Sequence, residues 1–247
     1  MRYAVGDIHG MSKLFFELMG KLNLTQKDRV YILGDAMDRG KDGIEVLQYI
    51  MKQENMIYIL GNHDDVFLTI VKNINEYNID TVEKLSTPSE YPDGVVDDLE
   101  YYRYSLYGES TLKDYLELTP EEQESIVKYL GKAQLWQIDD RFILVHAGYR
   151  AFRIDEAEAE SVLKMQRRHD LLWVRERFFL SRGLEGYITV FGHTVARTIP
   201  SGKRVAKGEV WRSDNGDKIG IDTGACFEGV LTAICLDTGE IIQVGKE

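Results

Sequence analysis

The chain has 247 residues, a net charge of −11, 44% hydrophobic residues and 29% charged residues. This composition is ordinary for a soluble globular protein, and the acidic surplus argues against unspecific binding to nucleic acid or to an anionic membrane. No apolar run reaches membrane-spanning length, and two cysteines do not support a disulfide scaffold. Met1 and Arg2 lead directly into a predicted strand, so we expect no signal peptide and a cytoplasmic location.

The first half of the chain alternates predicted strands and helices. Short apolar runs predict strands at 3–5, 30–33 and 56–60. A helix is expected from Ser12, which would be its N-cap, and another from Asp42, with Glu45 completing a capping box. Alternation of this kind indicates an α/β fold, with helices packed on a largely parallel sheet.

The pattern changes at about residue 73. Residues 73–131 hold fourteen Asp and Glu against four Lys and Arg, a net charge of −10, together with eight of the fourteen tyrosines. One helix is clear, with Thr119 as its N-cap, Pro120 as its first residue and Glu122 completing a capping box. We interpret 73–131 as an acidic, tyrosine-rich insertion or cap within a single domain that spans residues 1–247.

The second half returns to strands and helices. Strands are predicted at 142–145 and 187–191, and helices at 156–165 and 171–180. Antiparallel strands at 218–222, 229–236 and 240–244 are expected to end the chain. Cys226 and Cys235 would be reduced thiols within this strand region.

Five of the predicted strands end in a glycine-flanked residue of a type that binds metal ions. Asp7 and His9 are two residues apart, and in an extended segment such side chains point to the same side, so they could hold one ion. Four of the five histidines lie in these motifs. Chance placement explains one such motif but not the set. The motifs read GDIHG from Gly6, GDAMDRG from Gly34, GNHD from Gly61, HAG from His146 and FGHT from Phe191.

The candidate ligands are carboxylates, imidazoles and one amide, and none of them is a thiolate. This set suits manganese, iron or zinc better than a soft metal. Six ligands are too many for one tetrahedral ion but suit two ions about 3.5–4 Å apart that share a bridge. The sequence therefore predicts a site for two divalent ions.

The five motifs, in this order, resemble the phosphoprotein phosphatase branch of the calcineurin-like metallophosphoesterases. The resemblance implies a two-sheet α/β sandwich flanked by helices, with two divalent ions at the strand ends. Manganese is the first expectation for the metal, with iron or zinc as alternatives. Asp35 would bridge the two ions. The full ligand set carried over by motif is Asp7, His9, Asp35, Asn62, His146 and His193.

The resemblance also implies catalytic roles. Water activated by the metals would attack phosphorus in line, while Arg39 binds the phosphate oxygens. His63 would protonate the leaving oxygen as general acid, and Asp38 would hold its imidazolium. Arg175 would be a second phosphate-binding residue. Nearby alternatives for that role are Arg167, Arg168 and Arg177.

The substrate is less specified than the reaction. The first hypothesis is a bacterial-type serine/threonine phosphatase acting on phosphoproteins or a phosphorylated small molecule, with no nucleic-acid or membrane partner. The alternative is a symmetrical diadenosine tetraphosphate hydrolase, because the motif ending in Asp64 is also found there; a metal-free binding scaffold ranks third. The acidic insertion favours a phosphopeptide over a polyanion, whereas its tyrosines could stack an adenine. The turn at 222–224 is expected near the site without a catalytic role.

Overall fold

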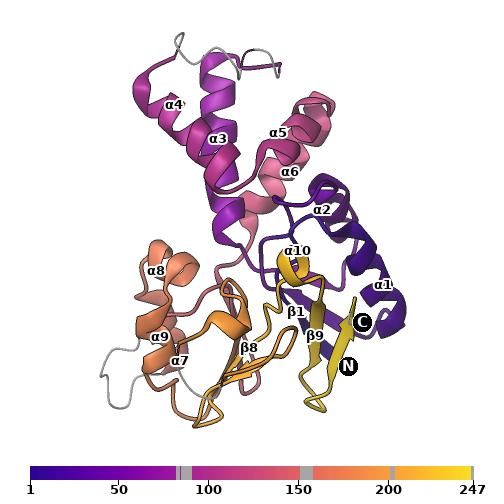
Figure 1. Ribbon diagram of the computed structural model, residues 1–247, viewed down its shortest axis with the longest axis vertical. Helices are drawn as coiled ribbons and strands as arrows, with labels where there is room; N and C mark the ends of the chain where they lie inside the picture. Colours follow the sequence, from indigo (N-terminus) through magenta and orange to yellow (C-terminus); the bar gives the residue numbers. More distant parts are fainter. Residues whose placement is uncertain (82–83, 85–90, 151–157, 201–203, 246–247) are drawn as a thin grey trace.

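The computed structural model describes residues 1–81, 84, 91–150, 158–200 and 204–245. Two five-stranded sheets lie face to face, with helices on their outer surfaces (Figure 1). The first sheet has the order β10-β9-β1-β2-β3 and the second β4-β5-β6-β8-β7. The strands of the first sheet are β1 (Arg2–Val5), β2 (Arg29–Ile32), β3 (Met56–Tyr58), β9 (Leu231–Cys235) and β10 (Ile241–Val244). Those of the second are β4 (Trp136–Asp139), β5 (Phe142–Val145), β6 (Ile188–Phe191), β7 (Trp211–Arg212) and β8 (Lys218–Gly220).

The centre of each sheet is parallel. β1 pairs with β2 and β2 with β3 in parallel, and the same holds for β5, β6 and β8. Apolar residues of the inner faces, such as Tyr31 of the first sheet and Leu144 of the second, form one buried cluster between the sheets. The predicted two-sheet α/β sandwich is therefore the observed architecture.

Helices cover both outer faces. α1 (Ser12–Leu22) and α2 (Gly43–Met51) pack on the first sheet. The second is covered by α7 (Ala159–Lys164), α8 (Arg168–Trp173) and α9 (Glu176–Leu180). Two short helices, η4 (Ala196–Thr198) and α10 (Ala225–Glu228), lie in the loops that follow β6 and β8.

The predicted N-cap of α1 is wrong, and the predicted N-cap of α2 is right in position only. The N-cap of α1 is Met11, and Ser12 is the first helical residue. Its hydroxyl instead donates to Asp42 Oδ2 at 2.6 Å. Asp42 is the N-cap residue of α2, as predicted, but its side chain makes no capping hydrogen bond and the capping box with Glu45 is absent. Its carboxylate accepts from Ser12 instead. The two helix starts are thus tied to each other rather than capped separately.

The single helix predicted at 171–180 is also wrong. α8 ends at Trp173 and α9 begins at Glu176, because Val174 is extended and Arg175 has φ −131° and ψ −104°. The break leaves Arg175 free of helical geometry. The helix predicted at 156–165 is present from Ala159, and its expected first residues lie outside the described part of the chain.

The C-terminal strands follow the prediction in part. β9 and β10 form the expected antiparallel pair. β8 does not join them: it lies in the other sheet, parallel to β6 and antiparallel to β7. Cys235 is buried in β9, whereas Cys226 lies in α10 and not in a strand.

The described residues between 73 and 131 are mostly helical and rise above the sheets (Figure 1). α3 (Asn62–Tyr77) runs upward from the first sheet, so the expected boundary at 73 falls inside a helix (Figure 1). It leads to four helical segments that we call the cap. Thr119 and Glu122 form the predicted capping box of the last of them. The cap segments are α4 (Asp93–Glu100), the π-helical turn η3 (Tyr101–Ser105), α5 (Glu109–Leu116) and α6 (Pro120–Lys132).

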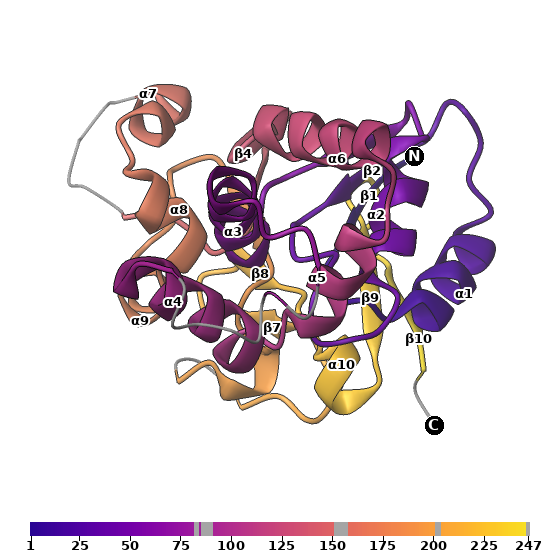
Figure 2. The same cartoon turned by 90° about the horizontal axis from the view of Figure 1, so that it is seen from above.

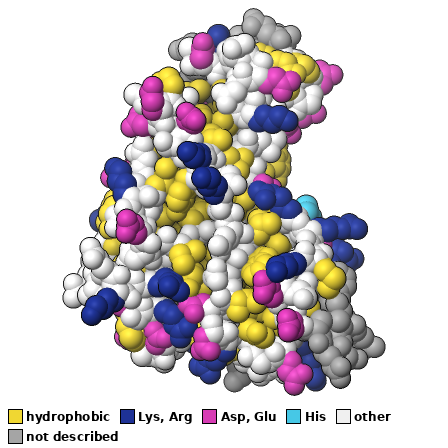
Figure 3. All heavy atoms as spheres, turned by 180° about the vertical axis from the view of Figure 1, so that it is seen from behind, with side chains coloured by type: hydrophobic (Ala, Val, Ile, Leu, Met, Phe, Trp, Pro, Cys, Tyr) yellow, Lys and Arg dark blue, Asp and Glu magenta, His cyan; other side chains and the backbone are white. Residues whose placement is uncertain are grey.

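The cap shares its core with the first sheet. Phe67 of α3 packs edge-on against Tyr115 of the cap, and both belong to the cluster that includes the inner residues of α1 and α2. Seen from above, α3, α5 and α6 lie over the strands (Figure 2). On the opposite side of the molecule from Figure 1, charged and hydrophobic side chains are interspersed (Figure 3). No described helix is long and apolar enough to cross a membrane.

Candidate metal centre and active site

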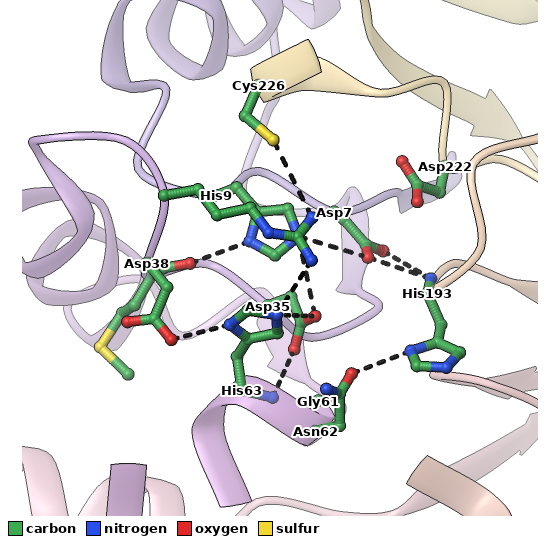
Figure 4. Close-up of polar contacts among 12 residues, drawn as sticks. Asp7, His9, Asp35, Asp38, Gly61, Asn62, His63, His193, Asp222 and Cys226 are labelled. Atoms are coloured by element: carbon green, nitrogen blue, oxygen red, sulfur yellow. Dashed lines mark hydrogen bonds and ion pairs between the residues drawn. The ribbon is translucent and has the colours of Figure 1, made fainter. Parts of the chain in front are cut away.

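The predicted ligands meet where the parallel strands of both sheets end. Asp7, Asp35 and Asn62 follow β1, β2 and β3, and His146 and His193 follow β5 and β6. The carboxyl ends of parallel strands lie at the same edge of a sheet, so these loops converge (Figure 4). All six predicted ligand residues are buried: Asp7, His9, Asp35, Asn62, His146 and His193.

Asp35 lies at the centre of this group. Its Oδ2 is 3.8 Å from His9 Nε2, 3.6 Å from His146 Nε2 and 3.9 Å from His63 Nε2. Among the described residues, two sets of side chains are close enough to hold an ion, His9 with Asp35 and His63, and Asp7 with Asp35 and His146. Because Asp35 belongs to both sets, it occupies the position predicted for the bridging ligand.

Two of the histidines present a lone pair to this centre. His9 Nδ1 donates to the Met37 carbonyl at 3.1 Å, and His146 Nδ1 donates to the Leu33 carbonyl at 2.6 Å. A ring N–H held by a carbonyl leaves Nε2 unprotonated. Burial lowers the pKa of both imidazoles, which favours the neutral form that binds metals.

Asn62 completes the second half of the centre. Its Oδ1 is 2.9 Å from His146 Nε2 and 2.9 Å from His193 Nδ1. His146 Nε2 and the amide oxygen both carry lone pairs, so they repel each other at this distance unless a positive charge is nearby. This contact fits residues arranged around a cation.

The carboxylates give the same indication. Burial, with the neighbouring charges of Asp222 and Asp35, raises the pKa of Asp7 well above its ordinary range. Burial also raises the pKa of Asp222 to about 6. Buried carboxylates this close together are costly unless a cation compensates them. The donor set therefore fits two divalent ions.

The backbone is strained at this centre. Several residues have a left-handed backbone, which costs about 1–3 kcal/mol for each residue other than glycine. Such strain concentrates at functional sites, where surrounding contacts hold it in place. The residues and their φ angles are His9 (49°), Asp35 (50°), Asp38 (65°), Arg39 (65°) and His193 (65°).

The prediction that Asp7 and His9 come together is met, but for a different physical reason. β1 ends at Val5, so neither residue lies on an extended strand, and His9 is left-handed. A turn, and not strand alternation, brings His9 Nε2 to 3.9 Å from Asp7 Oδ2.

The motif glycines permit close packing against the carboxylates. A Cβ on Gly61 would collide with Asp35 Oδ1, and one on Gly192 would collide with Asp7 Oδ1. Glycine at these two positions therefore lets the backbone approach the carboxylates closely.

His63 and Asp38 form a buried pair beside the centre. His63 Nδ1 donates to Asp38 Oδ2 at 2.8 Å, and the His63 backbone N–H donates to Asp35 Oδ1 at 3.1 Å. Burial alone would lower the pKa of His63, but the carboxylates of Asp35 and Asp38 outweigh it and raise that pKa. The imidazole is thus suited to carry a proton. Its general-acid role stays a prediction, because Nε2 also lies near Asp35.

The two predicted phosphate-binding arginines reach the centre from different sides. Arg39 Nη1 donates to His9 Nε2 at 2.8 Å, and its Nη2 lies 3.1 Å from His63 Nε2. Arg175 donates to Thr194 Oγ1 at 2.7 Å. Burial lowers the pKa of its guanidinium, and the negative charges of Asp7 and Asp222 oppose that shift. Of the alternatives, Arg168 is paired with Asp65. Arg167 and Arg177 are exposed, and so is Arg175, so the observation that favours Arg175 is its bond to Thr194 of the FGHT motif.

Sequence reasoning assigned no role to Asp222, yet the fold buries it in this group (Figure 4). Its Oδ1 accepts from the Gly224 N–H at 2.9 Å, which is the expected turn. The sequence held a signal for it: Asp222 is another acid at the end of an apolar strand, with glycines two residues away on either side, Gly220 and Gly224. His169, the histidine that lies outside the five motifs, is exposed and stacks on Trp173 with centroids 6.2 Å apart.

A family model described as calcineurin-like phosphoesterase matches residues 3–217. The chain belongs to this family. The crystal structure of a putative diadenosine tetraphosphatase has a TM-score of 0.67 to this calcineurin-like phosphoesterase at 18% identity, covering 100% of this chain and 93% of that one. The predicted calcineurin-like fold is confirmed, and the protein is a metal-dependent phosphoesterase.

The alignments with curated relatives cover different shares of those relatives' length. The symmetrical bis(5'-nucleosyl)-tetraphosphatase of Cellvibrio japonicus is 23% identical over 282 residues, covering 99% of this chain and 98% of the relative. The protein of that name from Nitrosospira multiformis is 26% identical over 164 residues, which cover 65% of this chain and 48% of the relative. This calcineurin-like phosphoesterase thus resembles proteins named for a dinucleotide substrate.

Proposed function

We propose that this protein hydrolyses a dinucleoside tetraphosphate symmetrically, adding water across the central anhydride to give two nucleoside diphosphates. The observation that carries the reaction class is Asp35, shared between two buried sets of nitrogen and oxygen ligands beside the His63–Asp38 pair. The names of the relatives support the substrate.

Each side chain at the centre would have a separate role in this reaction. Two divalent ions held by the ligand set would supply positive charge and make water a better nucleophile. Arg39 offers planar N–H donors to the non-bridging phosphate oxygens. As the new P–O bond forms, the bridging P–O bond breaks, and His63 Nε2 gives its proton to the departing oxygen. Asp38 Oδ2 stabilises the imidazolium through Nδ1.

An exposed aromatic ring beside Arg39 supports a nucleotide. Phe227 of α10 is 64% exposed, and its ring centroid lies 4.9 Å from Arg39 Cζ. Gly224 and Gly229 at the ends of α10 have left-handed φ angles of 78° and 72°, so this single turn is bounded by two sharp bends. A ring held this close to a phosphate-binding arginine offers a base a surface to stack on.

A phosphoserine or phosphothreonine protein is the second candidate. The net charge of −10 over residues 73–131 supports it, because an acidic cap attracts a peptide with basic flanks and repels a polyanion. The sequence alone ranked this substrate first. We rank the dinucleotide first because of the relatives and Phe227.

With Mn(II) present, kcat/KM is expected to be higher for diadenosine tetraphosphate than for a phosphopeptide with basic flanks. Chromatography of the products should show ADP alone. ATP together with AMP would contradict symmetrical cleavage. A preference for the phosphopeptide, most pronounced at low salt where steering by the cap is strongest, would establish the second candidate instead.

Replacing Phe227 with alanine is expected to raise KM for diadenosine tetraphosphate about tenfold, since stacking on an aromatic side chain contributes about 1–3 kcal/mol per base. Hydrolysis of p-nitrophenyl phosphate should not change. Tyr104→Ala is the matched control, because Tyr104 is also exposed and lies against an arginine, Arg103, at 5.0 Å. An unchanged KM in Phe227→Ala, or an equal rise in both variants, would exclude Phe227 as a base-binding residue.

A further inference from the structure

The cap reaches directly into the pair formed by His63 and Asp38. Tyr102 lies in η3, a π-helical turn of a kind that is rare and occurs frequently at functional sites. Its side chain is fully buried, with its ring 6.2 Å from that of Phe67. The Tyr102 hydroxyl donates to Asp38 Oδ1 at 2.6 Å. A residue 64 positions along the chain thus contacts the acid that holds the imidazole.

Asp38 uses each carboxylate oxygen for a different partner. Oδ2 accepts from His63 Nδ1 at 2.8 Å, and Oδ1 accepts from Tyr102. The Asp38 N–H donates to Thr111 Oγ1 at 3.0 Å, again a residue of the cap. Asp38 has a left-handed backbone outside any helix or strand, so these cap residues fix its position. Burial and the charge of Asp38 raise the pKa of Tyr102, so its phenol remains a donor.

We infer that Tyr102 is a positioning residue for proton transfer: its hydroxyl orients Asp38 so that Asp38 holds His63 with Nε2 toward the leaving oxygen. This rests on the proposed function only in that His63 acts as the general acid. The cap is then part of the catalytic apparatus as well as a surface over it. Excision of residues 73–131 would remove both Tyr102 and Thr111.

The competing explanation is that Tyr102 only satisfies a buried hydroxyl. Buried phenols usually have a hydrogen-bond partner, so the bond alone does not distinguish the two roles. A structural role predicts equal losses for every substrate. A positioning role predicts losses that grow as the leaving group becomes poorer, because a poor leaving group depends more on the proton.

Tyr102→Phe removes the hydroxyl and keeps the ring, and Tyr115→Phe is its matched control. Both tyrosines are buried in the cap and pack against Phe67. Activity is measured with Mn(II) on p-nitrophenyl phosphate, a good leaving group, and on an alkyl phosphate, a poor one. We expect kcat of Tyr102→Phe on the alkyl phosphate to fall about 10–100-fold, as for other outer partners of active-site groups. The loss on p-nitrophenyl phosphate should be much smaller, with KM unchanged.

The effect should also disappear when Asp38 is absent. In an Asp38→Ala background, adding Tyr102→Phe is expected to leave the ratio of the two kcat values unchanged, since residues that act through one another are not additive. Equal losses on both substrates in Tyr102→Phe, or a further change in the double variant, would overturn the inference.

A second readout does not need turnover. In protein labelled with ¹⁵N-histidine, the Nδ1–H proton of His63 is identified by its loss in His63→Asn. Tyr102→Phe should shift or broaden this resonance, whereas Tyr115→Phe should not. If the resonance moves but no phosphate ester or anhydride is hydrolysed, the proposed function fails and the positioning contact stands. If the resonance is unchanged in Tyr102→Phe, the inference is wrong.

Discussion

Removal of divalent ions with a chelator is expected to abolish hydrolysis of p-nitrophenyl phosphate, and Mn(II) should restore it. The reason is that the oxygens of Asp35 and Asn62 and the nitrogens of the imidazoles converge as a set of metal ligands. Elemental analysis of the active protein should give about two ions per chain, as in other two-metal hydrolases. The melting temperature should also rise with Mn(II), because a ligand that binds only the folded state stabilises it.

Asp35→Asn tests the shared ligand. It is expected to abolish both activity and the rise in melting temperature, because Asp35 belongs to both ligand sets. Asp65→Asn is the control, since Asp65 lies in the first turn of α3 but is half-buried and paired with Arg168. Protein that contains no metal, and that shows no hydrolysis under Mn(II), would instead support a binding scaffold. Full metal content in Asp35→Asn would exclude the bridging role.

His63→Asn is expected to lower kcat on a phosphopeptide or another alkyl phosphate about 10²–10⁴-fold, the usual contribution of a general acid. The loss should be smaller on p-nitrophenyl phosphate. It should also be smaller on diadenosine tetraphosphate, because the departing nucleoside diphosphate is already a stable anion. Metal content should be retained, because the six predicted ligands do not include His63 and remain in place in this variant.

The control for this variant is His169→Asn, which changes an exposed histidine outside the centre. It should have wild-type kinetics on every substrate. Equal losses on good and poor leaving groups in His63→Asn, or loss of an ion, would show that His63 is a ligand or a structural residue. That outcome is physically conceivable because His63 Nε2 lies 3.9 Å from Asp35 Oδ2.

The sequence by itself determined those helices and strands whose signals come from residues close together along the chain. Apolar runs placed β1, β2, β3, β5 and β6, and the signature around Thr119 placed the start of α6. The glycine-flanked residues after the strands identified the ligand types. These features could be predicted because periodicity, turn chemistry and capping act over a few residues.

Other features were decided by contacts between distant parts of the chain. The side chains of Ser12 and Asp42 bind each other, so neither side chain caps a helix, and β8 pairs with β6 in the second sheet. A local sequence pattern does not identify a contact partner that lies far away along the chain. The same limit applies to the break at Arg175, which ends a helix that its apolar spacing favoured.

The site shows the same division. The sequence determined that Asp7, Asp35 and Asn62 would lie at one edge of a parallel sheet, because each follows a strand of the same βα alternation. Only the tertiary structure brought His146 and His193 from the second sheet to Asn62, across 84 and 131 residues, and Tyr102 to Asp38 across 64. Whether a hydroxyl or imidazole meets a given partner depends on how layers pack, and packing is set by the whole chain.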